Sequence, residues 1–149
     1  MKRAILSLAI ICLAALTSAQ FKAPQQDVPA YSKTPLAKGE TLPKVLTSQQ
    51  LAANGVDHPA ALAAYKAAAR IPNVMHQQPC YCYCDRSHGH KSLHSCFEDM
   101  HGANCGTCVQ EALYSYKMSQ KGWTAKQIRD GIMRHEFQQI DLQNPEPVK

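Results

Sequence analysis

Six cysteines gathered in one short stretch constrain the fold of this chain more than any other feature of its sequence. They occur as a C-x-C-x-C run and a C-x-x-C pair, with one further cysteine between them. The part of the chain that we expect to be ordered is small, so a hydrophobic core alone would leave it marginally stable. A covalent or metal cross-link is therefore expected. The cysteines that can supply it are Cys80, Cys82, Cys84, Cys96, Cys105 and Cys108.

The start of the chain has the three parts of a secretory signal peptide. Two basic residues precede an apolar run that ends at Leu16, and the small residues 17–19 follow it. The run is short for a membrane span, and the small residues suit cleavage after Ala19. We therefore expect residues 1–19 to be removed. The mature protein is then exported, periplasmic or extracellular, and has no membrane span.

Three regions are expected in the mature chain. Residues 20–45 are rich in proline and glutamine, a composition typical of a flexible tether. Residues 46–140 contain the helical patterns and all six of the clustered cysteines, so we expect one Cys/His-rich domain there. Residues 141–149 carry two prolines and are expected to form a flexible tail.

The charge pattern gives no indication of a nucleic-acid partner. The formal net charge of the whole chain is +5, and two of the basic residues belong to the predicted signal peptide. Aromatic residues make up 7% of the chain, and the basic residues are scattered. The sequence therefore lacks the basic stripe and the stacking platform that nucleic-acid binding needs.

Capping residues and glycines predict two helices before the cysteine stretch. Thr47 and Ser48 can begin a short helix that Gly55 ends. Asp57 can cap a second helix over 60–70, which is rich in alanine. Alanine on several faces of this helix favours close packing against other helices.

Three further helices are predicted from the cysteine stretch onward. A short helix over 92–100 precedes a longer helix over 105–121, which Asn104 can cap. Thr124 and Gln127 form a capping box for a last helix. We therefore expect an all-α fold, a small helical domain with an irregular Cys-rich segment laid across it. The side chains of the last helix that are expected to face the core are Ile128, Ile132 and either Phe137 or Met133.

The C-x-C-x-C run alternates cysteine and tyrosine with a period of two residues. Pro79 disfavours helix at the residue before it, and the alternation is typical of an extended segment. Such a segment over 80–84 would place the three sulfurs on one side and the two tyrosines on the other.

Binding of a soft metal ion is the leading interpretation of the cysteine stretch. Thiolate and imidazole are the preferred ligands of zinc and copper(I), and ligands one or two residues apart can converge on one ion. Six thiolates exceed the four that a tetrahedral zinc uses, whereas a multinuclear copper(I) site could use more. We expect all six cysteines to be metal ligands. Among the four nearby histidines we expect His90, and then His101, to assist them.

Structural disulfides are a second interpretation, because small exported domains commonly contain them. Six cysteines permit 15 pairings. A bridge between Cys80 and Cys82 would be strained, since side chains two residues apart on an extended segment are parallel. Bridges from the C-x-C-x-C run to the later three cysteines are the more favourable pairings.

Thiol redox chemistry is the third interpretation. Cys105 opens a predicted helix, where the helix dipole and free N–H groups favour a thiolate, and Cys108 follows three residues later. No βαβ pattern of the thioredoxin type surrounds this pair. If the protein is an enzyme, we expect a thiol-disulfide oxidoreductase that acts on a partner protein. The metal-binding interpretation predicts a protein without catalytic activity.

At these residues the chain resembles a family of exported bacterial proteins named for a PCYCGC motif, also called the CYCXC family. The motif lies over 79–84, with Tyr83 at a position where many relatives have glycine. The resemblance covers roughly residues 79–137. Its further matches are Gly89-His90-Lys91-Ser92, Cys96-Phe97, His101-Gly102, the pair Cys105 and Cys108, and Ile128-Arg129.

The resemblance implies an extracytoplasmic protein, often a lipoprotein. The cysteine for lipid attachment is missing here, because Cys12 lies inside the apolar run and follows Ile11 instead of a small residue. Some relatives carry selenocysteine in the cysteine motif, which favours redox or soft-metal chemistry over inert disulfides. The resemblance implies no particular reaction. It also raises the redox interpretation nearly level with metal binding.

Overall fold

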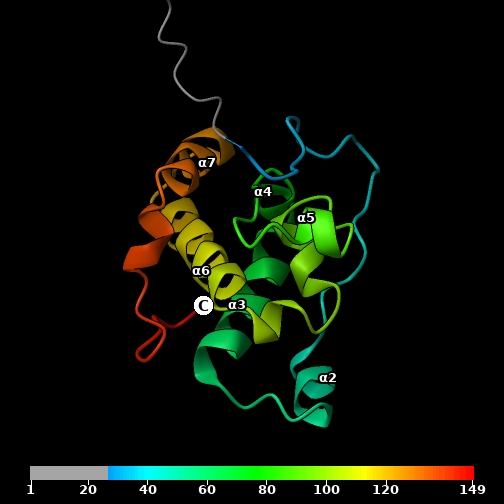
Figure 1. The fold of residues 1–149 in the computed structure, drawn as a ribbon, viewed down its shortest axis with the longest axis vertical. Helices are drawn as coiled ribbons and strands as arrows, with labels where there is room; N and C mark the ends of the chain where they lie inside the picture. Colours follow the sequence, from blue (N-terminus) through cyan, green and yellow to red (C-terminus); the bar gives the residue numbers. More distant parts are fainter. Residues whose placement is uncertain (1–26) are drawn as a thin grey trace, which may run out of the picture.

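The computed structural model describes residues 27–149, and that part of the chain is helical, with no β-strand (Figure 1). The expected all-α fold is confirmed. The predicted signal peptide, residues 1–19, lies outside the described residues, as does the beginning of the predicted tether. The helices are α2 (Ser48–Ala53), α3 (Pro59–Arg70), α4 (Pro72–His76), α5 (Cys84–Ser87), α6 (Gly106–Gln120) and α7 (Ala125–Met133). Short 3-10 turns are η1 (Leu93–Phe97), η2 (Gly102–Asn104) and η3 (Glu136–Gln139).

Helix α6 lies at the centre of the fold, against α3, α7 and η3 (Figure 1). Its most extensive partner is α3, as the alanine content of that helix predicted. Small side chains let the two helix backbones approach closely, and the alanines that face inward are at most 2% exposed. They are Ala60, Ala61, Ala64, Ala67 and Ala68.

Two of the predicted helix caps form as expected. The side chain of Thr47 accepts a hydrogen bond from the backbone N–H of Gln50, and Thr124 accepts one from Gln127. Both helices begin with a complete capping box. Each box satisfies N–H groups that would otherwise lack partners at the helix start.

Three local predictions were wrong. Helix α3 begins after His58 without a side-chain cap, so Asp57 is not its N-cap. The N-cap of α6 is Cys105 rather than Asn104. Asn104 is instead part of η2, and its side chain donates to the carbonyl of Met100 at 3.0 Å. The helix predicted over 92–100 is shorter and is the 3-10 turn η1.

Two groups of buried apolar side chains pack against α6. The larger group, which we call the thiol-side core, packs along α6 from Cys108 to Tyr116 and contains the buried sulfurs of four cysteines. The smaller group lies between α6, α7 and η3, and we call it the α7-side core. Three of its members, Ile128, Ile132 and Phe137, were predicted to face the core and are at most 3% exposed. The fourth is Tyr114.

The chain before α2 runs along the outside of α4 and α5 (Figure 1). The backbone N–H of Ala30 donates to a carboxylate oxygen of Asp85 at 3.0 Å, and that of Ser32 donates to the carbonyl of His76 at 3.1 Å. These bonds tie this part of the predicted tether to α5, which begins at Cys84, and to α4. The flexibility predicted for this region stays a prediction.

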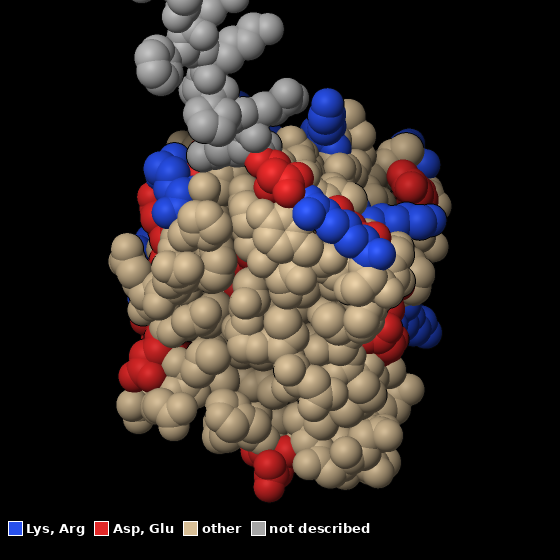
Figure 2. Space-filling model, viewed as in Figure 1, with Lys and Arg blue, Asp and Glu red and all other residues tan. Residues whose placement is uncertain are grey.

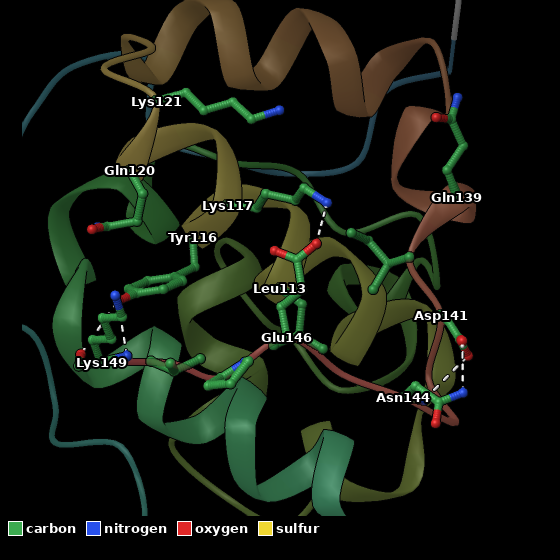
Figure 3. Close-up of a pocket in the computed structure, with 13 residues that line it drawn as sticks. Leu113, Tyr116, Lys117, Gln120, Lys121, Gln139, Asp141, Asn144, Glu146 and Lys149 are labelled. Atoms are coloured by element: carbon green, nitrogen blue, oxygen red, sulfur yellow. Dashed lines mark hydrogen bonds and ion pairs between the residues drawn. The ribbon is translucent and has the colours of Figure 1, made fainter.

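The C-terminal residues fold back over α6 and end beside α3 (Figure 1). Val148 is buried in the thiol-side core, and the backbone N–H of Lys149 donates to the hydroxyl of Tyr116 at 3.2 Å. Between this tail and α6 lies a groove of about 430 Å³, crossed by an ion pair between Lys117 and Glu146 (Figure 3). No cysteine or histidine lines the groove, so it is separate from the cysteine cluster.

Charged side chains of both signs are interspersed on the face shown in Figure 2, mostly near its upper part and its edges. The middle of that face carries few charges. Across residues 27–149 no helix combines the length and the apolar composition needed to cross a membrane. The exclusion of nucleic acid stays a prediction.

Candidate metal centre

The C-x-C-x-C run forms a tight turn, which corrects the prediction of an extended segment. The N–H of Tyr83 donates to the carbonyl of Cys80 at 3.0 Å, and α5 then begins at Cys84. Tyr83 has a φ of 57°, a left-handed conformation that favours glycine, and glycine is what many relatives have here. The alternation of cysteine and tyrosine predicted the wrong backbone conformation, because a turn, like an extended segment, can place every second side chain on the same side.

The turn brings its own sulfurs together and turns them toward α6. The Sγ atoms of Cys80 and Cys82 are 3.4 Å apart. Cys108, in the first turn of α6, lies 3.4 Å from Cys80 and 3.6 Å from Cys82, measured between Sγ atoms. The two halves of the cysteine stretch therefore converge.

The remaining cysteines complete the cluster from two other elements. Cys96 lies in η1, and its Sγ is 3.3 Å from that of Cys84 at the start of α5. Cys105 is half-buried at the start of α6. All six cysteines are free thiols. Their contact distances are close to the ~3.8 Å that separates sulfur atoms in a tetrahedral zinc site with 2.3 Å bonds.

Two histidines add nitrogen donors to the sulfurs. The Nε2 of His101 lies 3.5 Å from the Sγ of Cys82. His90 is largely buried near Cys84 and Cys96, and its Nδ1 has no hydrogen-bond partner among the described residues. The exposed ring of His88 packs edge-on against His101, with ring centroids 4.5 Å apart.

His94 lies in the same stretch but belongs to a different environment. It is 2% exposed, and its Nδ1 is 2.9 Å from a carboxylate oxygen of Glu98. Burial lowers the pKa of His94, although the contact with Glu98 opposes this effect. No group of metal donors includes His94, so its role is in packing.

The donors form two groups of four, each with all of its ligand atoms within 4.8 Å of one another. The groups have the number and chemistry of ligands that zinc and copper(I) use. The cluster can therefore hold a metal ion. The first group is Cys82, His101, Cys105 and Cys108, and the second is Cys84, His90, Cys96 and His101.

The hydroxyl of Tyr65 holds the loop that carries His101. It donates to the carbonyl of Asp99 at 2.5 Å and accepts from the N–H of Ala103 at 3.1 Å. Burial raises the pKa of Tyr65 to about 12, so the hydroxyl stays protonated and can serve as both donor and acceptor. These two bonds lie on either side of His101 and fix its backbone.

Gly102 lets the same loop pack closely against η1. A Cβ atom at this position would lie 2.6 Å from the carbonyl oxygen of Cys96 and 2.9 Å from the ring of Phe97. Those distances are too short for any other side chain. The main effect of Gly102 is therefore this close approach beside a ligand residue.

Glu111 is the functional candidate that the sequence analysis missed. Its carboxylate is 0% exposed in α6, and its Oε1 accepts from the N–H of Tyr81 at 2.8 Å, which ties the cysteine turn to the helix. Burial raises the pKa of Glu111 to about 8. Its position three residues after Cys108 places it on the cysteine face of the helix, a spacing that could have identified it.

The thiols shift one another's pKa values. Hydrogen bonds from Cys105 and Cys108 lower the pKa of Cys82. Those involving Cys108 and Cys80 lower that of Cys84 to about 3. For Cys105, the bond with Cys108 lowers the pKa, but the contact with Cys82 and burial outweigh it, so the pKa is raised. The thiolate predicted at the start of α6 is thus not favoured there.

These features define a class of small, all-helical protein with a converging cluster of six thiols and two imidazoles. The chain belongs to the family described as "protein of unknown function with PCYCGC motif", whose model matches residues 33–140. The family predicted by resemblance is confirmed, and the match extends N-terminally to include α2, α3 and α4. Comparisons with curated proteins and with solved structures found no match.

Proposed function

We propose that the protein captures a soft metal ion, copper(I) or zinc, outside the cytoplasm. The observation that carries this proposal is the convergence of six free thiols and two imidazoles from separate parts of the chain. The ligands are the six cysteines, assisted by His90 and His101. The protein acts by binding, without catalysing a reaction.

The donor types select the class of ion. Both four-donor groups contain only sulfur and nitrogen atoms. Calcium and magnesium prefer oxygen ligands, whereas thiolate and imidazole together favour zinc and copper(I). Each thiol that becomes a ligand loses its proton to solvent, so binding strengthens as the pH rises.

The burial of the donors suits capture from solution. Four of the cysteines are buried, which shields the thiolates from oxidants and bulk water. Cys82 and Cys105 are only half-buried and form an accessible side of the cluster, with His101 beside them. An ion can therefore reach the first sulfurs without unfolding of the helices.

A thiol-disulfide redox function is the second candidate, favoured by the contact between sulfur pairs. The Sγ atoms of Cys84 and Cys96 are 3.3 Å apart, so a small movement would let them form a bond. Oxidation of the two thiols would release two protons and pass two electrons to a disulfide of a thiol partner protein. That partner disulfide would be reduced to two thiols.

An anaerobic titration distinguishes the two functions. The chain from Gln20 onward is reduced, freed of reductant and titrated with copper(I) or zinc against a coloured chelator. We expect at least one tightly bound equivalent, and protection of all six cysteines from alkylation. Far less than one equivalent would overturn the proposal. His58→Ala, at an exposed histidine outside the cluster, serves as the matched control and should bind as the unaltered protein does.

A further inference from the structure

The cluster has more donors than one ion can use. A tetrahedral ion takes four ligands, and the described residues bring together six sulfurs and two imidazoles. A single ion would leave at least four donors unused in a largely buried site. Unused thiols and an unpartnered imidazole nitrogen in such a place need a physical explanation.

The two four-donor groups define two sides of the cluster, which adjoin each other because Cys82 lies within 4.8 Å of Cys84 and Cys96 within 4.8 Å of Cys108. On one side, Cys105 and Cys108 at the start of α6 meet Cys82. On the other side, Cys84 at the start of α5 meets Cys96 of η1. His90 belongs to the second side only, and the single donor that both four-donor groups share is an imidazole that lies between them.

Cys80 lies between the two sides and contacts both. Its Sγ is 3.4 Å from the sulfurs of Cys82 and Cys108 on the first side. It also falls within 4.8 Å of Cys84 and of Cys96 on the second side. Cys80 is only 2% exposed, so its sulfur can serve only ligands inside the protein. A thiolate has lone pairs enough to bind two ions at once.

We propose that the cluster holds two soft metal ions bridged by the thiolate of Cys80. This inference rests on the proposed function and adds the number of ions and their connection. One ion is bound by Cys82, Cys105 and Cys108, and the other by Cys84, Cys96 and His90. His101 lies beside both. Each cysteine that is still protonated loses one proton to solvent as it becomes a ligand, and no electron is transferred.

The unpartnered groups of the cluster agree with a pair of ions. The Nδ1 of His90 is buried without a hydrogen-bond partner, while its Nε2 lies 3.6 Å from a carboxylate oxygen of Asp99. A metal ion on one nitrogen and a carboxylate on the other is a common arrangement for a histidine ligand. The second ion therefore gives His90 the partner that the apoprotein lacks.

Cadmium-113 NMR tests the bridge directly, with cadmium as the soft-ion probe for zinc. The chain from Gln20 is loaded with cadmium-113 without oxygen. We expect two resonances of equal intensity, split by scalar coupling that passes through the shared sulfur. In Cys80→Ser the coupling should disappear. Two uncoupled resonances in the unaltered protein, or coupling that survives in Cys80→Ser, would overturn the bridge.

Two variants, each altered on one side of the cluster only, test whether there are two ions. Cys105→Ser should lose the ion beside α6 and keep the other, whereas Cys96→Ser should do the reverse, so each retains one resonance. Native mass spectrometry counts zinc and copper(I) in the same proteins. One tightly bound ion in the unaltered protein overturns the pair but leaves the proposed function standing. No tightly bound ion of any of the three metals overturns both.

Discussion

The two groups of side chains packed against α6 differ in how completely their polar atoms are satisfied. In the α7-side core, the hydroxyl of Tyr114 donates to a carboxylate of Glu136 at 2.6 Å, and the rest of the contact is apolar. In the thiol-side core, His90 and Glu111 each have a buried atom without a partner. The one polar group among the four buried side chains of the α7-side core is therefore satisfied, and the unpartnered Oε1 of Gln78 lies only at the edge of that core, where the amide of Gln78 donates to Ala125 of α7.

The difference supports the proposal that one face of α6 is stabilised by the chain alone and the other face is completed by a ligand. Buried polar atoms without partners weaken a folded state, whereas an ion bound only by the folded state strengthens it. Substitutions in the α7-side core should therefore change stability without changing metal binding. Changes at the thiol side should do both.

The largest effect is expected from Ile132→Ala in the α7-side core. Ile132 is 0% exposed, and removing its buried carbon atoms should lower the free energy of unfolding by about 2–5 kcal/mol. Urea denaturation of the apoprotein measures this change. Ile140→Ala, at a half-buried position beside both cores, is the matched control and should cost less. A loss of bound metal in folded Ile132→Ala would show that the two cores are not independent.

Metal loading is expected to have the next largest effect. At a free-ion concentration about 100 times Kd, binding should add about 2.7 kcal/mol to the free energy of unfolding. Hydrogen exchange should slow most in the first half of α6 and in η1, and little in α7. A chelator should reverse the change. Equal slowing in all helices would contradict the distinction between the two cores.

Tyr65→Phe should have a smaller effect on the thiol side. The variant removes the hydroxyl that holds Asp99 and Ala103, at a cost of about 1–2 kcal/mol. Because those bonds position the backbone of His101, metal affinity should fall while the number of bound ions stays the same. Competition with a chelator measures the affinity. An unchanged affinity would mean that the hydroxyl serves stability only.

The smallest effect is expected from Thr124→Ala, which removes the cap of α7. Loss of the capping box should lower the free energy of unfolding by about 1 kcal/mol and leave metal affinity unchanged. Thr47→Ala removes the equivalent box from α2 and is the matched control. A metal affinity that falls in Thr124→Ala would show that α7 influences the cysteine cluster.

The sequence predicted the start of a helix well where a complete capping box is present, and less well at single capping residues such as Asp57 and Asn104. The Thr124 capping box and the inward face with Ile128 and Ile132 follow from short-range spacing, and both form. The backbone of the C-x-C-x-C run was not predictable in this way. Its turn depends on a left-handed residue, Tyr83, and on a tie to the distant Glu111.

The candidate site was also predictable only in part, because local spacing shows which ligand residues are present but not how distant segments pack together. Cysteine density marked the stretch, but its spacing left open whether the two halves meet. Their convergence depends on how η1 and α6 pack, which is a long-range property. The roles of Tyr65 and Glu111 depend on that packing too, because both act through backbone groups far away in sequence.

Intact mass spectrometry of the protein, isolated without chelator or reductant, tests the central claim most directly. Under non-denaturing conditions the account predicts a protein that carries two soft metal ions. After acid denaturation it predicts the mass of a chain with all six cysteines as thiols. A metal-free protein, lighter by two hydrogen atoms for each disulfide and resistant to mild reductant, would contradict the account and establish the cysteines as structural cross-links.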